Sequence, residues 1–193
     1  MNSIVILAAI PDEFIPDSVN GIDIIYTGVG KINAAYSTTK VILEQKPRLI
    51  LNVGTAGVLS VESLGKVHDV RSVIERDFLA MPLAVRGSVP FDNSKNEFIL
   101  NDHGIKVATG DSFVTENDSW LNQQKVDLVD MELFAIAKVS NKLGVPCMAI
   151  KYGSDLANSN ASMDWEKSLN RAKFLLNEKI RDSLNLAGKN LSH

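Results

Sequence analysis

Short runs of apolar and β-branched residues alternate along this chain with longer segments whose apolar residues recur every three or four positions. Runs of four to eight apolar residues are typical of buried strands, and the longer spacing is typical of amphipathic helices. The pattern predicts strands over residues 4–7, 23–26, 49–53, 67–74, 106–108, 126–129 and 147–152. Nearly continuous apolar strands indicate a sheet that is covered on both faces.

Three helices are predicted between and after these strands, over residues 33–45, 131–143 and 163–187. Gly144 and Pro146 follow the second helix as stop signals, and Ser162 is a candidate N-cap of the third. Residues 81–104 are rich in Pro, Gly, Asn, Asp and Ser and are predicted to form a long loop. Alternating strands and helices favour one three-layer α/β domain over residues 1–193.

Composition narrows the class of protein. The 193 residues are 45 % hydrophobic and 22 % charged, as expected for a globular chain, and the net charge of -3 argues against a nucleic-acid partner. The single cysteine, Cys147, favours a reducing compartment. No apolar run approaches the roughly 20 residues of a membrane span, and residues 4–10 do not resemble a signal peptide. We therefore expect a soluble cytoplasmic protein that binds no membrane.

Polar and glycine residues collect after the predicted strands. They fall at residues 11–13, 27–31, 54–57, 109–113, 130–132 and 153–155. In open α/β sheets, ligands bind beyond the carboxyl ends of the strands, so these segments predict a small-molecule site at one rim.

Taken singly, each of these segments is also typical of ordinary structure. The turn at residues 28–31 is neither a Walker A loop nor a GxGxxG fingerprint, and Gly54 and Gly57 suit a tight turn after a strand. Met131 and Phe113 are also typical of a hydrophobic core. Glu132 is typical of a helix start, and Asp155 of an N-cap or a turn. The scattered histidines and the lone cysteine favour neither a zinc site nor a nucleophilic triad, so we expect no metal and no cofactor.

Taken in order, the segments resemble the purine nucleoside phosphorylase superfamily. The motifs are Ala9-x-x-x-Glu13, residues 27–35, residues 52–57, residues 109–113, residues 129–132 and Ser154-Asp155. The resemblance spans residues 4–187 and is closest to the branch that holds methylthioadenosine/S-adenosylhomocysteine nucleosidase. It implies an αβα sandwich with a mixed central sheet, usually a homodimer, that cleaves the bond between ribose C1′ and a purine.

The resemblance also implies roles for individual residues. Asp155 would donate a proton to purine N7, Ser154 would orient it, and Glu13 would activate the attacking water. The remaining implied contacts are Glu132 with the ribose hydroxyls, Met131 with the sugar, Phe113 and the Val114 backbone with the base, Thr55 near the water, and Ile10 and Trp165 at the 5′ substituent.

Charge favours hydrolysis over phosphorolysis. Related phosphorylases hold phosphate with arginines after the first strand and before the glycines of the third, whereas this chain has acidic residues 12–13 and Asn52 there. The expected partners are thus a purine nucleoside and water. A phosphorylase and a non-catalytic nucleoside-binding protein on the same fold remain the alternatives.

Three departures from the family pattern bear on activity and specificity. Lys151, which the resemblance places among the substrate-binding residues, stands where the nucleosidases have arginine, so it keeps the charge but lacks the guanidinium fork. Asp130 replaces a glutamate. Residues 75–106 are shorter than in the familiar enzymes. That region helps to shape the 5′ pocket and the dimer contact, so the 5′ substituent stays open.

Overall fold

The computed structural model describes residues 3–14, 22–93, 95–157 and 161–189, with the side chains of 161–163 and 184–189 outside that description. The strands are β1 (Ile4–Ala8), β2 (Asp23–Tyr26), β3 (Leu49–Val58), β4 (Val67–Glu75), β5 (Glu97–Ile99), β6 (Ile105–Thr109), β7 (Leu128–Asp130) and β8 (Cys147–Leu156). The helices are α1 (Lys31–Gln45), α2 (Ser119–Gln123), α3 (Leu133–Lys142) and α4 (Ala161–Lys189), with 3-10 turns η1 (Pro11–Glu13) and η3 (Val61–Ser63).

The eight strands form one mixed sheet in the order β2-β1-β3-β7-β6-β4-β5, and β8 pairs with both β3 and β4. The pairs β3·β7, β4·β5 and β4·β8 are antiparallel, and the other pairs are parallel. Because β8 joins β3 to β4, the strands β3, β7, β6, β4 and β8 close into a ring. The ring brings together strand ends that lie far apart in the sequence.

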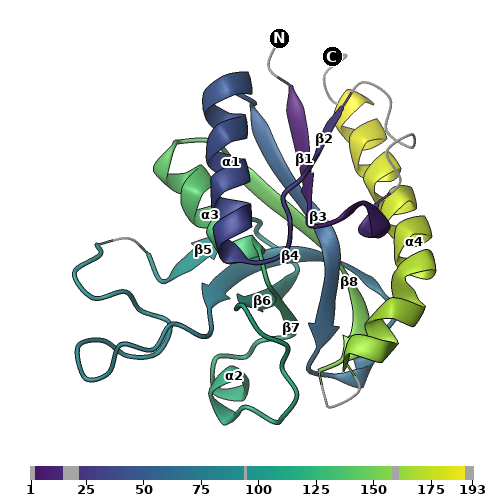
Figure 1. Cartoon of the computed structure of the whole chain (residues 1–193). Helices are drawn as coiled ribbons and strands as arrows, with labels where there is room; N and C mark the ends of the chain where they lie inside the picture. Colours follow the sequence, from purple (N-terminus) through teal and green to yellow (C-terminus); the bar gives the residue numbers. More distant parts are fainter. Residues whose placement is uncertain (1–2, 15–21, 94, 158–160, 190–193) are drawn as a thin grey trace.

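Helices cover both faces of the sheet (Figure 1). On one face, Ala172, Leu176 and Ile180 of α4 pack against Ile6 and other residues of β1, β3 and β8. On the other, α1 and α3 lie side by side over β1 and β3, and α3 extends the core to β4, β6 and β7. The predicted three-layer αβα sandwich with a mixed sheet is confirmed. None of the described helices has the length and apolar character needed to cross a bilayer.

Several predicted boundaries were wrong. Strands β3 and β8 extend to Val58 and Leu156, so the glycines at 54 and 57 and the Ser154-Asp155 pair lie inside strands and not in turns after them. The predicted loop over 81–104 contains β5, and α2 was not predicted. Ser162, the candidate N-cap, falls inside α4, and its side chain lies outside the described residues.

Candidate active site

A cavity of about 270 Å³ lies where the strand ends of the ring meet η1 and the start of α4. Ten of the eleven side chains predicted to form the site line it: Ile10, Glu13, Thr55, Phe113, Val114, Met131, Glu132, Ser154, Asp155 and Trp165. The eleventh, Lys151, is 1 % exposed and lies in the protein interior, outside the cavity lining. The fold thus brings six segments of the sequence to one place.

Ser154 and Asp155 owe their placement to a β-bulge. Ala56 pairs with Gly153 and Gly57 pairs with Asp155, so Ser154 is an extra residue in β8 without a partner in β3. Consecutive side chains of a regular strand point to opposite faces, whereas a bulge redirects them. Here both side chains line the cavity. A Cβ at Gly57 would lie 3.1 Å from Asp155 Oδ1, so a glycine at this position leaves room for the carboxyl group.

The surroundings of Asp155 favour its protonated form. Burial raises the pKa of Asp155 against the opposing effect of the Ser154 hydroxyl, and Asp164 raises it further. Ser154 Oγ lies 2.6 Å from Asp155 Oδ2 and 3.2 Å from the Ala56 carbonyl oxygen. One hydroxyl proton serves only one of these acceptors. When it serves Ala56, a proton on Asp155 completes the other contact.

Glu13 lies on η1 and is held through one of its oxygens. The Thr55 backbone N–H donates to Glu13 Oε1 at 2.9 Å, and the Thr55 hydroxyl donates to the same atom at 2.5 Å. A Cβ at Gly54 would lie 3.0 Å from Glu13 Oε2, so glycine is needed for this close approach of strand and carboxylate. Glu13 is 6 % exposed although its neighbours Pro11 and Asp12 are exposed.

Glu132 is the residue before the first turn of α3, and it is buried in the cavity wall. The Gly30 N–H, in the turn before α1, donates to Glu132 Oε1 at 2.9 Å. Burial, followed by the nearby Asp130 carboxylate, raises the pKa of Glu132 to about 7 despite the opposing charge of Lys151. Glu132 is therefore placed to change its charge near neutral pH.

Lys151 supports this wall from behind. Its Nζ lies 2.8 Å from Asp130 Oδ2, and both side chains are almost fully buried. Burial lowers the pKa of Lys151, but the carboxylates of Asp130, Glu132 and Glu13 outweigh it and the net direction is upward. Asp130 also accepts hydrogen bonds from the Thr109 hydroxyl at 2.5 Å and the Leu133 N–H at 3.0 Å. Lys151 thus stays charged and stabilises the carboxylates around it.

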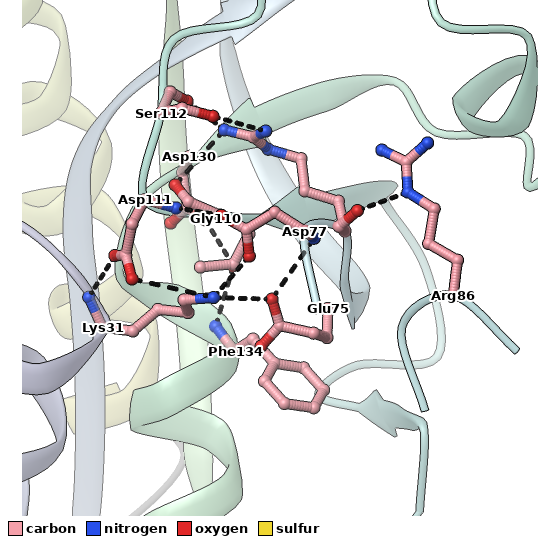
Figure 2. Close-up of polar contacts among 11 residues, drawn as sticks. Lys31, Glu75, Asp77, Arg86, Gly110, Asp111, Ser112, Asp130 and Phe134 are labelled. Carbon is pink, nitrogen blue, oxygen red and sulfur yellow. Dashed lines mark hydrogen bonds and ion pairs between the residues drawn. The ribbon is translucent and has the colours of Figure 1, made fainter. Parts of the chain in front are cut away.

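Arg76, which the sequence prediction missed, lies in the cavity wall at the end of β4 and is 4 % exposed. Its terminal nitrogens donate to the Gly110 and Ser112 carbonyl oxygens and to Ser112 Oγ (Figure 2). A Cβ at Gly110 would lie 2.7 Å from Arg76 Cζ, so a glycine at 110 is needed for this packing. Arg76 therefore fixes the backbone directly before Phe113.

Lys31 holds the same loop from the other side (Figure 2). Its N–H donates to Asp111 Oδ1 at 2.8 Å, and its Nζ pairs with Glu75 and Asp77. The Asp111 N–H in turn donates to Asp77 Oδ2 at 2.5 Å. Burial alone would raise the pKa of Asp77, but hydrogen bonds from Glu75, Lys31 and Asp111 lower it to about 2. A charged network thus connects the first residue of α1 to the loop after β6.

One sequence signal for Arg76 was available. Glu75 is the last residue of β4 and Arg76 and Asp77 follow it, so three consecutive charged residues stand at a strand end, where ligand sites of α/β sheets lie. In the described part of the chain, no cluster of three or more His, Cys, Asp or Glu side chains is placed to hold a metal ion.

The fold agrees with the comparisons to known proteins. The family model of the Phosphorylase superfamily matches residues 93–189. A 5′-methylthioadenosine/S-adenosylhomocysteine nucleosidase of Staphylococcus haemolyticus is 30 % identical over an alignment of 183 residues, and the match covers 83 % of this chain and 80 % of that protein. The corresponding Staphylococcus aureus protein (strain JH9) is 31 % identical over 172 residues, covering 76 % of this chain and 73 % of its own length.

The chain belongs to the Phosphorylase superfamily. Within that superfamily it belongs to the family of the 5′-methylthioadenosine/S-adenosylhomocysteine nucleosidases, which are N-glycosyl hydrolases.

Solved structures give the same fold at lower identity. The Helicobacter pylori nucleosidase with butyl-thio-DADMe-Immucillin-A has a TM-score of 0.85 at 21 % identity, covering 96 % of this chain and 98 % of its own. The futalosine hydrolase of the same organism has a TM-score of 0.84 at 21 % identity, covering 95 % and 97 % of the two chains.

Proposed function

We propose that this chain hydrolyses the N-ribosidic bond of an adenosine-type nucleoside with a 5′-thio substituent, releasing the free purine and the ribose derivative. Methylthioadenosine and S-adenosylhomocysteine, which name its relatives, are the model substrates. Asp155 is the general acid and Glu13 the general base. Glu132 and Met131 bind the ribose, and Phe113 and Val114 bind the purine.

In this mechanism the C1′–N9 bond breaks with its electron pair going to the purine, while Asp155 transfers a proton to N7. A water molecule forms the new bond to C1′, and Glu13 takes its proton. The raised pKa of Asp155 supports the first role, because a general acid must be protonated near the working pH. The fixed position of Glu13 supports the second role, because a base must be held within hydrogen-bond reach of the water.

The distribution of charge is the observation that carries hydrolysis over phosphorolysis. Glu13, Glu132 and the protonated Asp155 line the cavity, and the Asp130 carboxylate behind them is paired with Lys151. Among the described residues of the lining, Arg76 is the arginine, and it donates from one terminal nitrogen to the Gly110 and Ser112 carbonyls and from the other to the Ser112 hydroxyl. A phosphate dianion would therefore meet the Glu13 and Glu132 carboxylates and an arginine whose terminal nitrogens are already engaged, whereas a neutral water is not repelled. The Glu13 and Glu132 carboxylates also stabilise the positive charge that develops on the ribose.

The test is an incubation in phosphate-free buffer with methylthioadenosine, S-adenosylhomocysteine, adenosine, inosine and futalosine, with free base measured by chromatography. We expect base from the 5′-thio nucleosides without phosphate, at a rate that added phosphate does not change. Base that forms only with phosphate, together with ribose 1-phosphate, would establish a phosphorylase. A rise in melting temperature with a nucleoside but without turnover would establish a binding protein.

We also propose that the chain forms a homodimer in the cytoplasm. The segment between β4 and β5 carries apolar side chains that are more than a third exposed, which a partner surface would cover. These residues are Phe78, Leu79, Met81, Leu83, Val85 and Phe91. Sedimentation of the wild type should give twice the mass of the chain, and Leu79→Glu combined with Leu83→Glu should shift it to the monomer. Cell fractionation tests the location, for which the single cysteine is the supporting observation.

A further inference from the structure

Trp165 makes a polar contact that its expected role as an apolar wall for the 5′ substituent does not require. It lies near the start of α4 and lines the cavity. Its indole Nε1 lies 2.8 Å from Thr55 Oγ1. The same hydroxyl lies 2.5 Å from Glu13 Oε1, so three side chains from α4, β3 and η1 form one hydrogen-bonded chain.

The chemistry of the three groups fixes the direction of this chain. An indole N–H only donates, so Thr55 Oγ1 is the acceptor of the first bond. The carboxylate oxygen Glu13 Oε1 accepts, so the single hydroxyl proton points to it, while a lone pair of the same hydroxyl accepts from Trp165. The Thr55 backbone N–H donates to the same oxygen at 2.9 Å. Glu13 Oε1 thus receives two hydrogen bonds whose direction does not reverse.

The two carboxylate oxygens of Glu13 therefore have different roles. Oε1 is committed to Thr55, and the described residues provide no hydrogen-bond donor to Oε2, which lies beside Gly54. Oε2 is therefore the oxygen that accepts a proton from water. Without the indole N–H, the Thr55 hydroxyl would keep its bond to Glu13 Oε1 but lose the second contact that fixes the position of its oxygen, so the carboxylate would be held less firmly.

We propose that Trp165 is a positioning residue that acts through Thr55 to hold Glu13 in the orientation needed to activate water. The proposal rests on the assignment of Glu13 as the general base. It also connects the helix expected to contact the 5′ substituent with the residue that activates the water.

The test is a double-mutant cycle with Trp165→Phe and Thr55→Val, using methylthioadenosine as substrate. Phenylalanine keeps an aromatic wall and removes the N–H. We expect Trp165→Phe to lower kcat about tenfold, the effect of losing one hydrogen bond in a charged network, while KM changes less than about twofold. In the Thr55→Val background, where the chain is already broken, Trp165→Phe should leave kcat unchanged.

Two control variants separate this effect from a general loss of structure. Trp120→Phe removes the other indole of the chain, which stacks on Arg86 outside the cavity lining, and should leave kcat as in the wild type. Thr55→Ser keeps the hydroxyl and should remain sensitive to Trp165→Phe. The proposal is overturned if Trp165→Phe raises KM alone, or if it lowers kcat equally in the wild type and in Thr55→Val.

A measurement without turnover separates the proposal from the proposed function. The indole ¹⁵N–¹H signal of Trp165 should shift in Thr55→Val and in Glu13→Gln, while that of Trp120 stays in place. A responsive signal in a protein that releases no base would refute the proposed function and keep the hydrogen-bonded chain. If base is released but the Trp165 signal shifts in neither variant, the proposed function is kept and the hydrogen-bonded chain is refuted.

Discussion

Two parts of the cavity wall are built in different ways. Asp155 lies near the end of the long buried strand β8, where the bulge between β3 and β8 and the Ser154 hydroxyl place its carboxyl group. The loop before Phe113 is largely exposed, and Arg76, Lys31, Asp77 and Asp111 hold it by ion pairs and hydrogen bonds. The strand gives Asp155 a buried position with few polar partners, whereas the loop keeps its position through many polar partners.

The difference follows from what each part must do. A general acid needs a raised pKa, and burial supplies it only where charged partners are few. A loop that binds a flat base needs a fixed position, and charged hydrogen bonds provide it on an exposed segment. Changes in the strand should therefore affect the chemical step, and changes in the network should affect binding of the base.

Asp155→Asn should have the largest effect on the strand side. We expect kcat to fall by about 10²- to 10⁴-fold, because the amide cannot protonate N7, with little change in the affinity for a nucleoside. Single-turnover rates and calorimetric Kd values provide the measurement. Asp164→Asn, which changes a nearby carboxylate that raises the pKa of Asp155, should cost far less. Equal losses in kcat and in affinity would contradict the role of Asp155.

Lys151→Met tests the buried pair that lies behind the cavity. Removal of the ammonium leaves the Asp130 carboxylate buried without its partner, so the free energy of unfolding should fall by about 3–5 kcal/mol. Urea denaturation measures it, with the exposed Lys40→Met as the matched control. A change as small as that of the control would show that Lys151 does not stabilise the carboxylates.

Arg76→Lys tests the network that holds the loop. The substitution keeps the positive charge, but one ammonium cannot hold the Gly110 and Ser112 carbonyls as the guanidinium does. We expect Kd for free adenine to rise about tenfold while kcat changes little. Arg71→Lys, at an exposed position of the same strand, is the control. A drop in kcat with unchanged adenine affinity would show that the loop network acts on the chemical step, which would contradict its assignment to binding of the base.

The smallest expected effect is a pH dependence from Glu132. Its pKa in the folded protein, about 7, lies above the ordinary value, so its protonated form stabilises the fold and this contribution is lost as pH rises through 7. Over the same range the ionised carboxylate becomes a better acceptor for ribose hydroxyls, so kcat/KM should rise. Glu132→Gln should remove both pH dependences. A rise in kcat/KM near pH 7 that persists in the variant belongs to another group.

Much of the candidate site could be predicted because strand ends and motif order are properties of the sequence. Glu13, Glu132 and Asp155 follow apolar segments, and parallel strands bring such ends to one rim. The glycines at 54 and 57 were misinterpreted as a turn. They lie within β3, where they make room for Glu13 and Asp155 and do not reverse the chain. Local sequence does not distinguish these two uses of glycine.

Residues that act through distant partners could not be predicted in the same way. Arg76 contacts carbonyls 34 and 36 positions later, and any loop can supply carbonyls. Lys151 was placed at the substrate because its family position suggested it. Its burial against Asp130 depends on the pairing of β3, β6, β7 and β8, which no local pattern encodes.

The extra residue in β8 adds a hydroxyl group beside the carboxyl group of Asp155. Pairing with β3 resumes at Gly57 and Asp155, so loss of Ser154 would leave Asp155 opposite Gly57 and on the same face of the sheet. The loss would remove the hydroxyl that lies 2.6 Å from Asp155 Oδ2. An in-frame deletion of this one residue would therefore give a more regular sheet whose acid has lost its hydroxyl partner, a defect that measurements of stability alone would not detect.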